Sequence, residues 1–536
     1  MGDPWESPAG EAQQPSREGS KRSGSWAWMG KESGMATIKA GPGATAYSNV
    51  DVLPLPPDRR TWGKTTFVFF WISTAINIAE WSGAAASLAL GLTVGQAILV
   101  NAISTIIITI ALVVNGHGGG KWHVPFAIIN RASWGMYGGQ MVKVLIGSLW
   151  PSFYNMKNHF PSDIGMETND FVGFIIFYVL SVPIFMLKPE RYRLPAILSS
   201  FAAIVAAFSI FIWALAKQRG GGPLFSAPAA VTGVPRLRGA QLGWVMMRCI
   251  TSGIGGWAGG ILYQSDFSRY ARRSGDQLWG QIFAIPVCLL GSNILGIVAT
   301  SCARGFYPEE PLLWKIYDLL AAVQRHEGPG ARAAVFFAAL AFVASQLSVT
   351  VIACGVVGGM DLAALLPRYL NIRRGSFVVA IVGICINPWR ILNTANSFIS
   401  AMSSYAIFLA PLTGIMVADY HFLRGRRLKL SHLYMPNTSS DYWFWHGINW
   451  RAPIAWVLGV WPHLPGFAAT VTPDKVQVNS TWINVYYLSW PLAFCISASV
   501  WMALNTLWPP PGVGEVDDES DDVSVDEKSP GFEEGL

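Results

Sequence analysis

Apolar stretches of roughly 20 residues recur along this chain, and no other feature limits its fold as strongly, because a helix of that length crosses a lipid bilayer. They run from Phe67 to Leu507 without a long polar interruption. Hydrophobic residues make up 52% of the chain and charged residues 13%, which fits a bilayer-embedded protein rather than a soluble one. A backbone in lipid must satisfy its own hydrogen bonds, so we predict an all-α polytopic membrane protein.

Hydropathy predicts twelve transmembrane helices in one membrane domain. The predicted spans cover residues 66–92, 95–115, 134–153, 171–187, 195–216, 243–263, 280–303, 333–358, 376–391, 399–421, 452–470 and 483–507. The corresponding organisation is an N-terminal tail at 1–62, a transmembrane domain at 63–508 and an acidic tail at 509–536. The six cysteines lie within or beside apolar stretches and lack metal-ligand spacing, so neither a zinc site nor a disulfide scaffold is indicated.

Basic residues in the short loops predict how the spans are oriented. The loops after even-numbered spans carry Lys121 and Arg131; Lys188, Arg191 and Arg193; Arg269, Arg272 and Arg273; Arg368, Arg373 and Arg374; and Arg424, Arg426, Arg427 and Lys429. By the positive-inside rule, these loops and both termini face the cytoplasm. The loop between spans five and six also carries basic residues, Lys217 and Arg219 among them, yet the alternation of the other loops places it outside.

The third predicted span is unusual for a membrane helix. Residues 134–153 must cross if the basic loops on both sides share the cytoplasm, but they contain four glycines and Lys143 near the midpoint. A lysine at the centre of a span costs about 2.5–3.5 kcal/mol on insertion scales. The sequence therefore predicts a shortened third helix.

Span six contains a glycine-rich segment, SGIGGWAGG, around Trp257. Glycines allow a helix to unwind near the middle of the membrane, and the flat indole of Trp257 would suit a stacked planar heterocycle. The alternative is that the small residues only permit close helix packing. Both interpretations remain open at this point.

Span one carries Ser73, Asn77 and Glu80 within FFWISTAINIAEWSG. A carboxylate or an amide inside a membrane span is a candidate functional group by default, because its burial in lipid is costly. Glu80 could carry a coupling proton, or it could pair with a neighbour such as Lys143 and serve only the structure.

Several blocks of sequence together resemble the nucleobase-cation-symport family, in particular its fungal uracil, allantoin and uridine permease branch. The blocks are HVPFAIINRASWGMYG (123–138), GGWAGG followed by DFSRYAR (255–272), DLAALLPRYLNIRRG (361–375), NPWRILNTANSFISAMSSYAIFLAPLTGIMVADY (387–420) and YWFWHGINWRAPIAWVLG (442–459). The resemblance implies twelve spans arranged as a LeuT-type five-plus-five inverted repeat plus two. It also implies alternating access and a multi-pass protein of the plasma membrane.

The resemblance also implies a set of site residues. The substrate would stack between Trp257, preceded by Gly256, and a tryptophan of span three, with Asn77 nearby. The backbones of Ser73 and Ile76 and the hydroxyl of Ser348 would match ligands of the family's sodium site. Cys354 stands where the family usually has a substrate-binding asparagine.

Two departures from the family pattern affect the predicted mechanism. The span-three motif of a tryptophan and a glutamine is absent, because Gly138 runs directly into Gly139, and about 20 residues are missing. In span eight, Val349 stands where a bacterial relative has a sodium-ligating threonine. The loss of this oxygen favours a co-transported proton, with sodium as the alternative.

The expected function is a secondary active permease that imports a uracil- or allantoin-like heterocycle by cation symport, without a cofactor. The alternative is a non-transporting membrane sensor, or an inactive product of a wrongly assembled gene sequence that lacks part of helix three. No paired-carboxylate or Ser/His/Asp constellation lies at one depth, so an enzyme is not expected.

The expected partners are a small-molecule heterocycle and the lipid bilayer. The short basic loops fit topology signals and not nucleic-acid binding. The acidic tail at 515–536 is a solvated disordered segment or a site for ubiquitin-ligase adaptors, with Lys528 as the acceptor.

Overall fold

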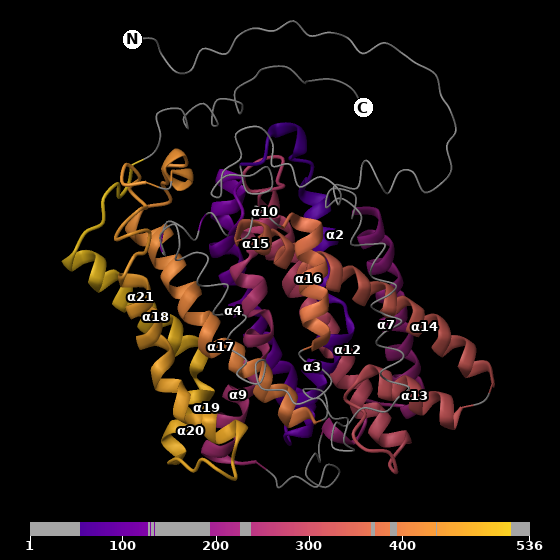
Figure 1. The fold of residues 1–536 in the computed structure, drawn as a ribbon. Helices are drawn as coiled ribbons and strands as arrows, with labels where there is room; N and C mark the ends of the chain where they lie inside the picture. The colour runs from indigo at the N-terminus through magenta and orange to yellow at the C-terminus, as the bar shows by residue number, and fades with distance from the viewer. Residues whose placement is uncertain are drawn as a thin grey trace, which may run out of the picture. The chain divides into compact units, whose positions relative to one another are not determined.

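The structure is a computed structural model that describes residues 54–126, 129, 133, 193–225, 237–327, 329–365, 370–385, 394–435 and 437–515, all within the compact unit 40–536. In these ranges the regular secondary structure is helical, with two isolated β-bridges (Figure 1). The α-helices are α2 (Lys64–Ala75), α3 (Ile78–Ala89), α4 (Val94–Trp122), α7 (Arg193–Gln218), α9 (Gly239–Leu262), α10 (Gln264–Ser268), α11 (Asp276–Trp279), α12 (Ile285–Phe306), α13 (Ile316–His326), α14 (Pro329–Val349), α15 (Val357–Leu365), α16 (Ile372–Cys385), α17 (Ala395–Val417), α18 (Arg451–Val460), α19 (Leu464–Val471), α20 (Ser480–Tyr487) and α21 (Ser489–Leu507).

Shorter helical turns connect or extend these helices. The 3₁₀ turns are η1 (Pro57–Arg59), η5 (Pro223–Phe225), η10 (Ser431–Tyr434) and η11 (Trp461–His463). The π-helical segments are η6 (Gly280–Ala284), η7 (Thr350–Val356) and η9 (Ala418–Leu423). The π-helical segments adjoin α12, α14 and α17, so they belong to long membrane-embedded helices.

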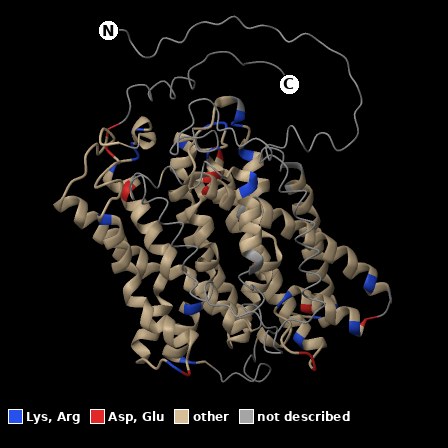
Figure 2. Cartoon of the chain, viewed as in Figure 1, with Lys and Arg blue, Asp and Glu red and all other residues tan. Residues whose placement is uncertain are grey.

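Among the described residues, seven helical stretches are long and apolar enough to cross a membrane. They are Val94–Trp122, Ile197–Gln218, Asp276–Phe306, Gly330–Val349, Ala395–Leu423, Arg451–Val471 and Ser489–Leu507, which coincide with predicted spans two, five, seven, eight, ten, eleven and twelve. Predicted spans three and four lie outside the described residues. Lys, Arg, Asp and Glu positions, coloured on the cartoon, lie mostly near the ends of the helices, and most of each helix is uncharged (Figure 2). The protein is therefore a multi-pass membrane protein.

Predicted span one is two half-helices and not one helix. α2 ends at Ala75 and α3 begins at Ile78, with Ile76 and Asn77 between them. The Asn77 side chain caps α3, because its Oδ1 accepts hydrogen bonds from the backbone nitrogens of Ala79 (2.8 Å) and Glu80 (3.1 Å). An asparagine that caps a helix start favours a break at this point, and the continuous span predicted over 66–92 is corrected accordingly.

Span six breaks at the end of its glycine-rich helix. α9 is helical through all its glycines, so the helix does not unwind around Trp257, which was one of the two possibilities that the sequence left open. The helix ends at Leu262 before the short α10. The glycines allow close packing instead: a Cβ on Gly255 would lie 2.1 Å from the carbonyl oxygen of Met402 in α17. At the break, Asn115 Nδ2 of α4 donates to the carbonyls of Ile261 (2.6 Å) and Leu262 (3.1 Å).

The helices that position the site pack directly on one another. α9 contacts α4 and α17, while α12 contacts α3 and α4. α17 also packs on α21, and α7 on α14, so further helices cover this central group (Figure 1). On α7 and α14, large apolar side chains such as Phe201 and Phe337 are 69% and 67% exposed, as expected of surfaces that face lipid.

Candidate functional site

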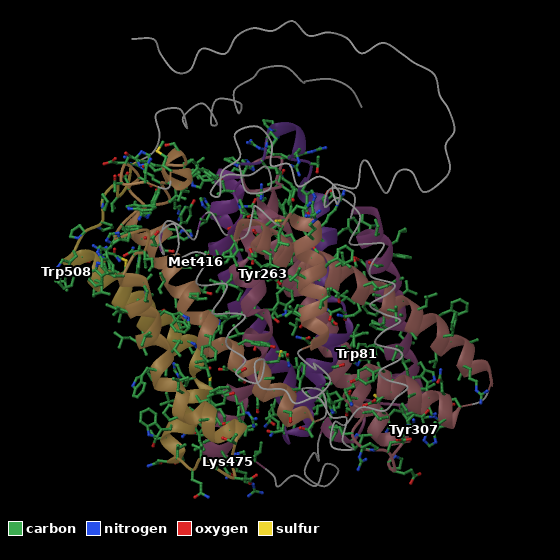
Figure 3. The ribbon with its side chains drawn as sticks, viewed as in Figure 1. Trp81, Tyr263, Tyr307, Met416, Lys475 and Trp508 are labelled. Carbon is green, nitrogen blue, oxygen red and sulfur yellow. The ribbon has the colours of Figure 1, made fainter. Side chains whose placement is uncertain are left out.

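A cavity of about 200 Å³ lies between α3, α4, α9, α12 and α17. Its lining residues are Ala79, Glu80, Gly83, Ala84, Ser87, Val100, Asn101, Ser104, Thr105, Ile108, Cys249, Ser252, Gly253, Gly256, Trp257, Leu289, Asn293, Phe398, Ile399 and Met402. Figure 3 labels Trp81 of α3 and Tyr263 at the end of α9; neither is a lining residue. A mainly apolar cavity with a few convergent polar groups is the usual form of a small-molecule site.

Trp257 and Gly256 form part of the α9 wall. Trp257 is buried, and its ring centroid lies 6.2 Å from that of Trp71 in α2 at an interplanar angle of 37°. Its indole Nε1 is buried and has no hydrogen-bond partner among the described residues. Next to it, a side chain on Gly256 would meet the sulfur of Met402 at 3.6 Å, so the glycine keeps this part of the cavity open.

Glu80 places a carboxylate in the cavity wall. It stands in the first turn of α3, where the helix dipole favours a negative charge. Among the described residues no lysine, arginine or histidine forms an ion pair with it, and the partner suggested by the sequence, Lys143, lies outside these residues. Glu80 is therefore an acidic group without a basic partner in the described part of the site.

Two amides that the sequence reasoning missed lie on the opposite helices. Asn101 of α4 and Asn293 of α12 are buried, and their side chains hydrogen-bond at 3.2 Å. Ser104, one turn further along α4, donates to the Ile250 carbonyl of α9 at 3.2 Å. The rule that singled out Asn77 and Glu80, a polar group inside an apolar span, would also have found both asparagines.

The other predicted substrate residues have different surroundings. Asn77 does not line the cavity, since its Oδ1 caps α3 and its Nδ2 donates to the Thr74 carbonyl at 2.6 Å. Cys354 lies in the π-helical segment η7, and its side chain falls outside the described residues. The structure thus brings Trp257, Gly256 and Glu80 together at one cavity.

The predicted cation-site residues lie near the break in span one. The Ile76 carbonyl accepts a hydrogen bond of 2.9 Å from Ser345 in α14. Ser348, one turn later, is buried, and its hydroxyl has no hydrogen-bond partner in the described part of the chain. The side chain of Ser73 lies outside the described residues.

The sequence predicted Ser348 as the hydroxyl ligand of span eight and did not indicate Ser345. An ungapped count back from the LLP at residues 365–367 places the residues of span eight, and that count crosses the π-helical segment η7. A π-helical turn contains more residues than an α-helical turn, so it rotates everything before it. The structure shows which α14 hydroxyl contacts the break, whereas an ungapped count does not account for this rotation.

The sequence profile of a family described as "Permease for cytosine/purines, uracil, thiamine, allantoin" matches residues 54–139 and 136–493. The transporter aclS of Aspergillus oryzae is 31% identical over 90% of this chain and 90% of its own length. The allantoin permease and the uracil permease of Saccharomyces cerevisiae are 31% and 29% identical, each over 87% of this chain and 76% of the relative.

Solved structures of Mhp1, described as a nucleobase-cation-symport-1 family transporter, share the fold. Its inward-facing conformation aligns with a TM-score of 0.64 and 19% identity over 89% of this chain and 98% of that one. Its closed conformation with bromovinylhydantoin bound aligns with a TM-score of 0.60 and 20% identity over 86% and 97%. Since the family profile covers most of the sequence from Pro54 onward, the chain belongs to the nucleobase-cation-symport family of permeases, in its fungal branch, and is a transporter and not an enzyme.

Proposed function

We propose that this protein is a secondary active permease that imports a planar uracil- or allantoin-like heterocycle by cation symport with alternating access. The cavity between the five central helices carries this proposal, because it combines an aromatic wall with amide and carboxyl groups. The names of the allantoin and uracil permeases among the relatives support the substrate class.

The lining residues suggest how a heterocycle would be held. The Trp257 ring offers a face for stacking, and Gly256 leaves room beside it. The side chains of Asn101, Asn293 and Glu80 supply donors and acceptors for the amide edges of the ring. Apolar walls with few polar contacts would give orientation and specificity together.

A proton is the proposed coupling ion, and no cofactor is required. Glu80 lines the cavity without a basic partner among the described residues, so it can take up a proton when the solute enters. Sodium is the alternative, bound by the backbone carbonyls of Ser73 and Ile76 with the hydroxyls of Ser345 and Ser348. In that case the transported cation would lie at the break in span one and not at Glu80.

The proposed architecture is twelve spans with a five-plus-five inverted repeat plus two, in a membrane domain at 63–508 between two cytoplasmic tails. Breaks in both the first and the sixth span support it, because these spans correspond in the two repeats. We place the protein in the plasma membrane. We retain the acidic tail with Lys528, which lies outside the described residues, as the proposed contact for ubiquitin-ligase adaptors.

Uptake into yeast cells that lack their own permeases tests the proposal. We expect saturable uptake of labelled uracil or allantoin, which a protonophore abolishes and removal of sodium does not change. Trp257→Ala should raise KM on the order of 10-fold, because stacking of a base on an aromatic ring is worth about 1–3 kcal/mol. Trp461→Ala, which removes a tryptophan that is 62% exposed, is the matched control and should transport normally.

Glu80→Gln separates coupling from binding. The variant keeps the shape of the side chain and removes its titration, so we expect exchange of labelled solute to persist while accumulation against a gradient is lost. Glu309→Gln, an exposed carboxylate outside the cavity, is the control. Accumulation by Glu80→Gln at the wild-type level would exclude Glu80 as the proton carrier.

A further inference from the structure

Arg248 of α9 is a buried cation that the proposed function does not use. Its side chain is 8% exposed. Nη2 donates to Asn396 Oδ1 at 2.8 Å and to Ser400 Oγ at 2.7 Å, both in α17. The guanidinium also lies 5.5 Å from the ring centroid of Tyr487 in α20. All three partners are electrically neutral.

Arg248 has no carboxylate partner within the described part of the chain, where the arginine ion pairs are those of Arg325 and Arg424. Its Nε is buried and has no hydrogen-bond partner among these residues. Removing an ion from water without an opposite charge is costly, and ionised groups inside membrane proteins normally face a partner or a solute pathway. The environment of Arg248 therefore favours an additional anion.

Arg248 does not itself line the cavity, but it adjoins residues that do. On α9 it precedes Cys249 and lies one turn before Ser252, and both of these residues line the cavity. On α17 its hydrogen-bond partners Asn396 and Ser400 stand on either side of the lining residues Phe398 and Ile399 in the sequence. The guanidinium and its two partners thus form the layer of side chains next to the cavity.

A neighbouring helix closes this layer. Thr251 Oγ1 of α9 donates to the Tyr487 carbonyl at 2.5 Å, and the Tyr486 hydroxyl donates to the Ser400 carbonyl at 3.1 Å. These contacts keep the positive charge away from bulk water. A cation that is only partly solvated by neutral groups attracts an anion more strongly than one at the protein surface.

We propose that Arg248 is a specificity-determining residue that binds an anionic group of the solute, so that the preferred substrate is a heterocycle bearing a carboxylate. The inference rests on the proposed function and narrows its substrate class. Guanidinium binds carboxylate through charge-assisted hydrogen bonds, and Nε and Nη1 make no hydrogen bond to the described residues. Among the lining residues Glu80 is the acidic one, so until it takes up its proton, repulsion would turn the carboxylate away from it and towards Arg248.

Binding to the purified full-length protein, followed by tryptophan fluorescence, tests the proposal without requiring transport. Two pairs of probes differ by a carboxylate: uracil with orotate, and hydantoin with hydantoin-5-acetate. We expect at least one carboxylate to bind on the order of 10-fold or more tighter than its neutral partner. Arg248→Gln should weaken that carboxylate on the order of 30-fold, as expected when one partner of a buried charge pair is removed, and change the neutral probe less than about threefold.

Two further variants distinguish the loss of a binding contact from a folding defect. Arg248→Lys keeps the charge and should keep the preference for the carboxylate, while Arg332→Gln, an exposed arginine of α14, should bind like the wild type. A wild-type protein that binds neither carboxylate more tightly than its neutral partner overturns the inference, and so does an equal loss of both probes in Arg248→Gln. If yeast cells that make this protein and lack their own permeases still take up uracil or allantoin, the proposed permease function holds even where the inference about Arg248 fails.

Discussion

Asn77 joins the two half-helices of the first span through its side chain. Its Oδ1 caps α3 and its Nδ2 binds the Thr74 carbonyl at the end of α2. Both ends of the amide are therefore engaged by the backbone. In this structure Asn77 shapes the break at Ile76 and is not a lining residue of the cavity.

Substitutions at Asn77 distinguish a cap from a substrate ligand. We expect Asn77→Ala to lower the free energy of unfolding by about 1 kcal/mol, the usual cost of losing an N-cap. Asn77→Asp keeps the acceptor and should retain most of that stability. Thermal unfolding of the detergent-solubilised protein gives the comparison. Wild-type stability in Asn77→Ala, with a selective loss of substrate affinity in both variants, would instead indicate a direct contact with the solute.

His123 is a second residue whose side chain and backbone are both constrained. It follows the last residue of α4 with a left-handed φ of 53°, and its Nδ1 lies 3.0 Å from the Arg269 carbonyl oxygen. Burial lowers the pKa of His123 to about 4 from an ordinary value of 6.5, while the hydrogen bond to Arg269 opposes the shift in part. The imidazole is therefore neutral in the folded protein at neutral pH.

The lowered pKa of His123 predicts a pH dependence of stability. Between pH 6.5 and 4 the unfolded state binds more protons than the folded state. The contribution of His123 to the free energy of unfolding is therefore complete above pH 6.5 and is lost as the pH falls towards 4. The slope is at most about 1.4 kcal/mol per pH unit. His123→Asn, which tolerates a left-handed φ, should flatten the thermal-unfolding profile over this range. His446→Asn, at an exposed position with a φ of 48°, should leave the profile unchanged.

At the scale of elements, the glycines of α9 lie at its contacts with α17 and α4. Gly255 lies against the Met402 carbonyl so closely that no side chain fits, and Gly253 faces Ser104 of α4. The break occurs at Tyr263, where Asn115 of α4 binds the carbonyls that lose their helical partners.

Two glycines of the same helix give a matched comparison. Gly255→Ala would place its Cβ 2.1 Å from the Met402 carbonyl, so we expect a loss of about 1–3 kcal/mol in stability through overpacking. Gly243→Ala meets nothing within 4 Å and should be neutral or stabilise the helix by up to about 1 kcal/mol. Thermal unfolding of both variants measures the difference. An equal effect at the two positions would contradict the packing role of Gly255.

At the scale of the whole molecule, the family profile matches the chain in two segments, 54–139 and 136–493. The two matched segments meet at residues 136–139, where the motif comparison places the missing part of span three. The cavity retains Trp257, Glu80 and two asparagines without that segment. These features favour the transporter over the alternative of a non-transporting sensor or an inactive product.

Sequencing the mature transcript across the codons for Gly138 and Gly139 tests whether a coding segment is missing between them. We expect reads that contain an intervening coding segment with the tryptophan and glutamine of the family motif. A full-length protein that includes the segment should then bind the solute more tightly, because a second aromatic face would be present. If the codons are contiguous, the protein lacks the span-three tryptophan that would face Trp257 across the substrate, and the sensor interpretation becomes the leading one.

The sequence by itself determined that this is a polytopic helical membrane protein of the nucleobase-cation-symport family. Apolar runs must satisfy the hydrogen bonds of their backbone in lipid, and the blocks that resemble the family, such as DFSRYAR, are read directly from the chain. It also indicated Trp257, Gly256 and Glu80 as candidate site residues, since a polar, aromatic or small residue inside an apolar span can be identified without knowing its neighbours in space.

Only the tertiary structure decided which of the local possibilities occurs. A glycine-rich helix can unwind or pack, and the choice at Gly255 depends on Met402, about 150 residues away. The pairing of Asn101 with Asn293 and the surroundings of Arg248 likewise join distant helices. Local sequence limits what a backbone or side chain can do, whereas the energy that selects one arrangement comes from partners that folding brings next to it.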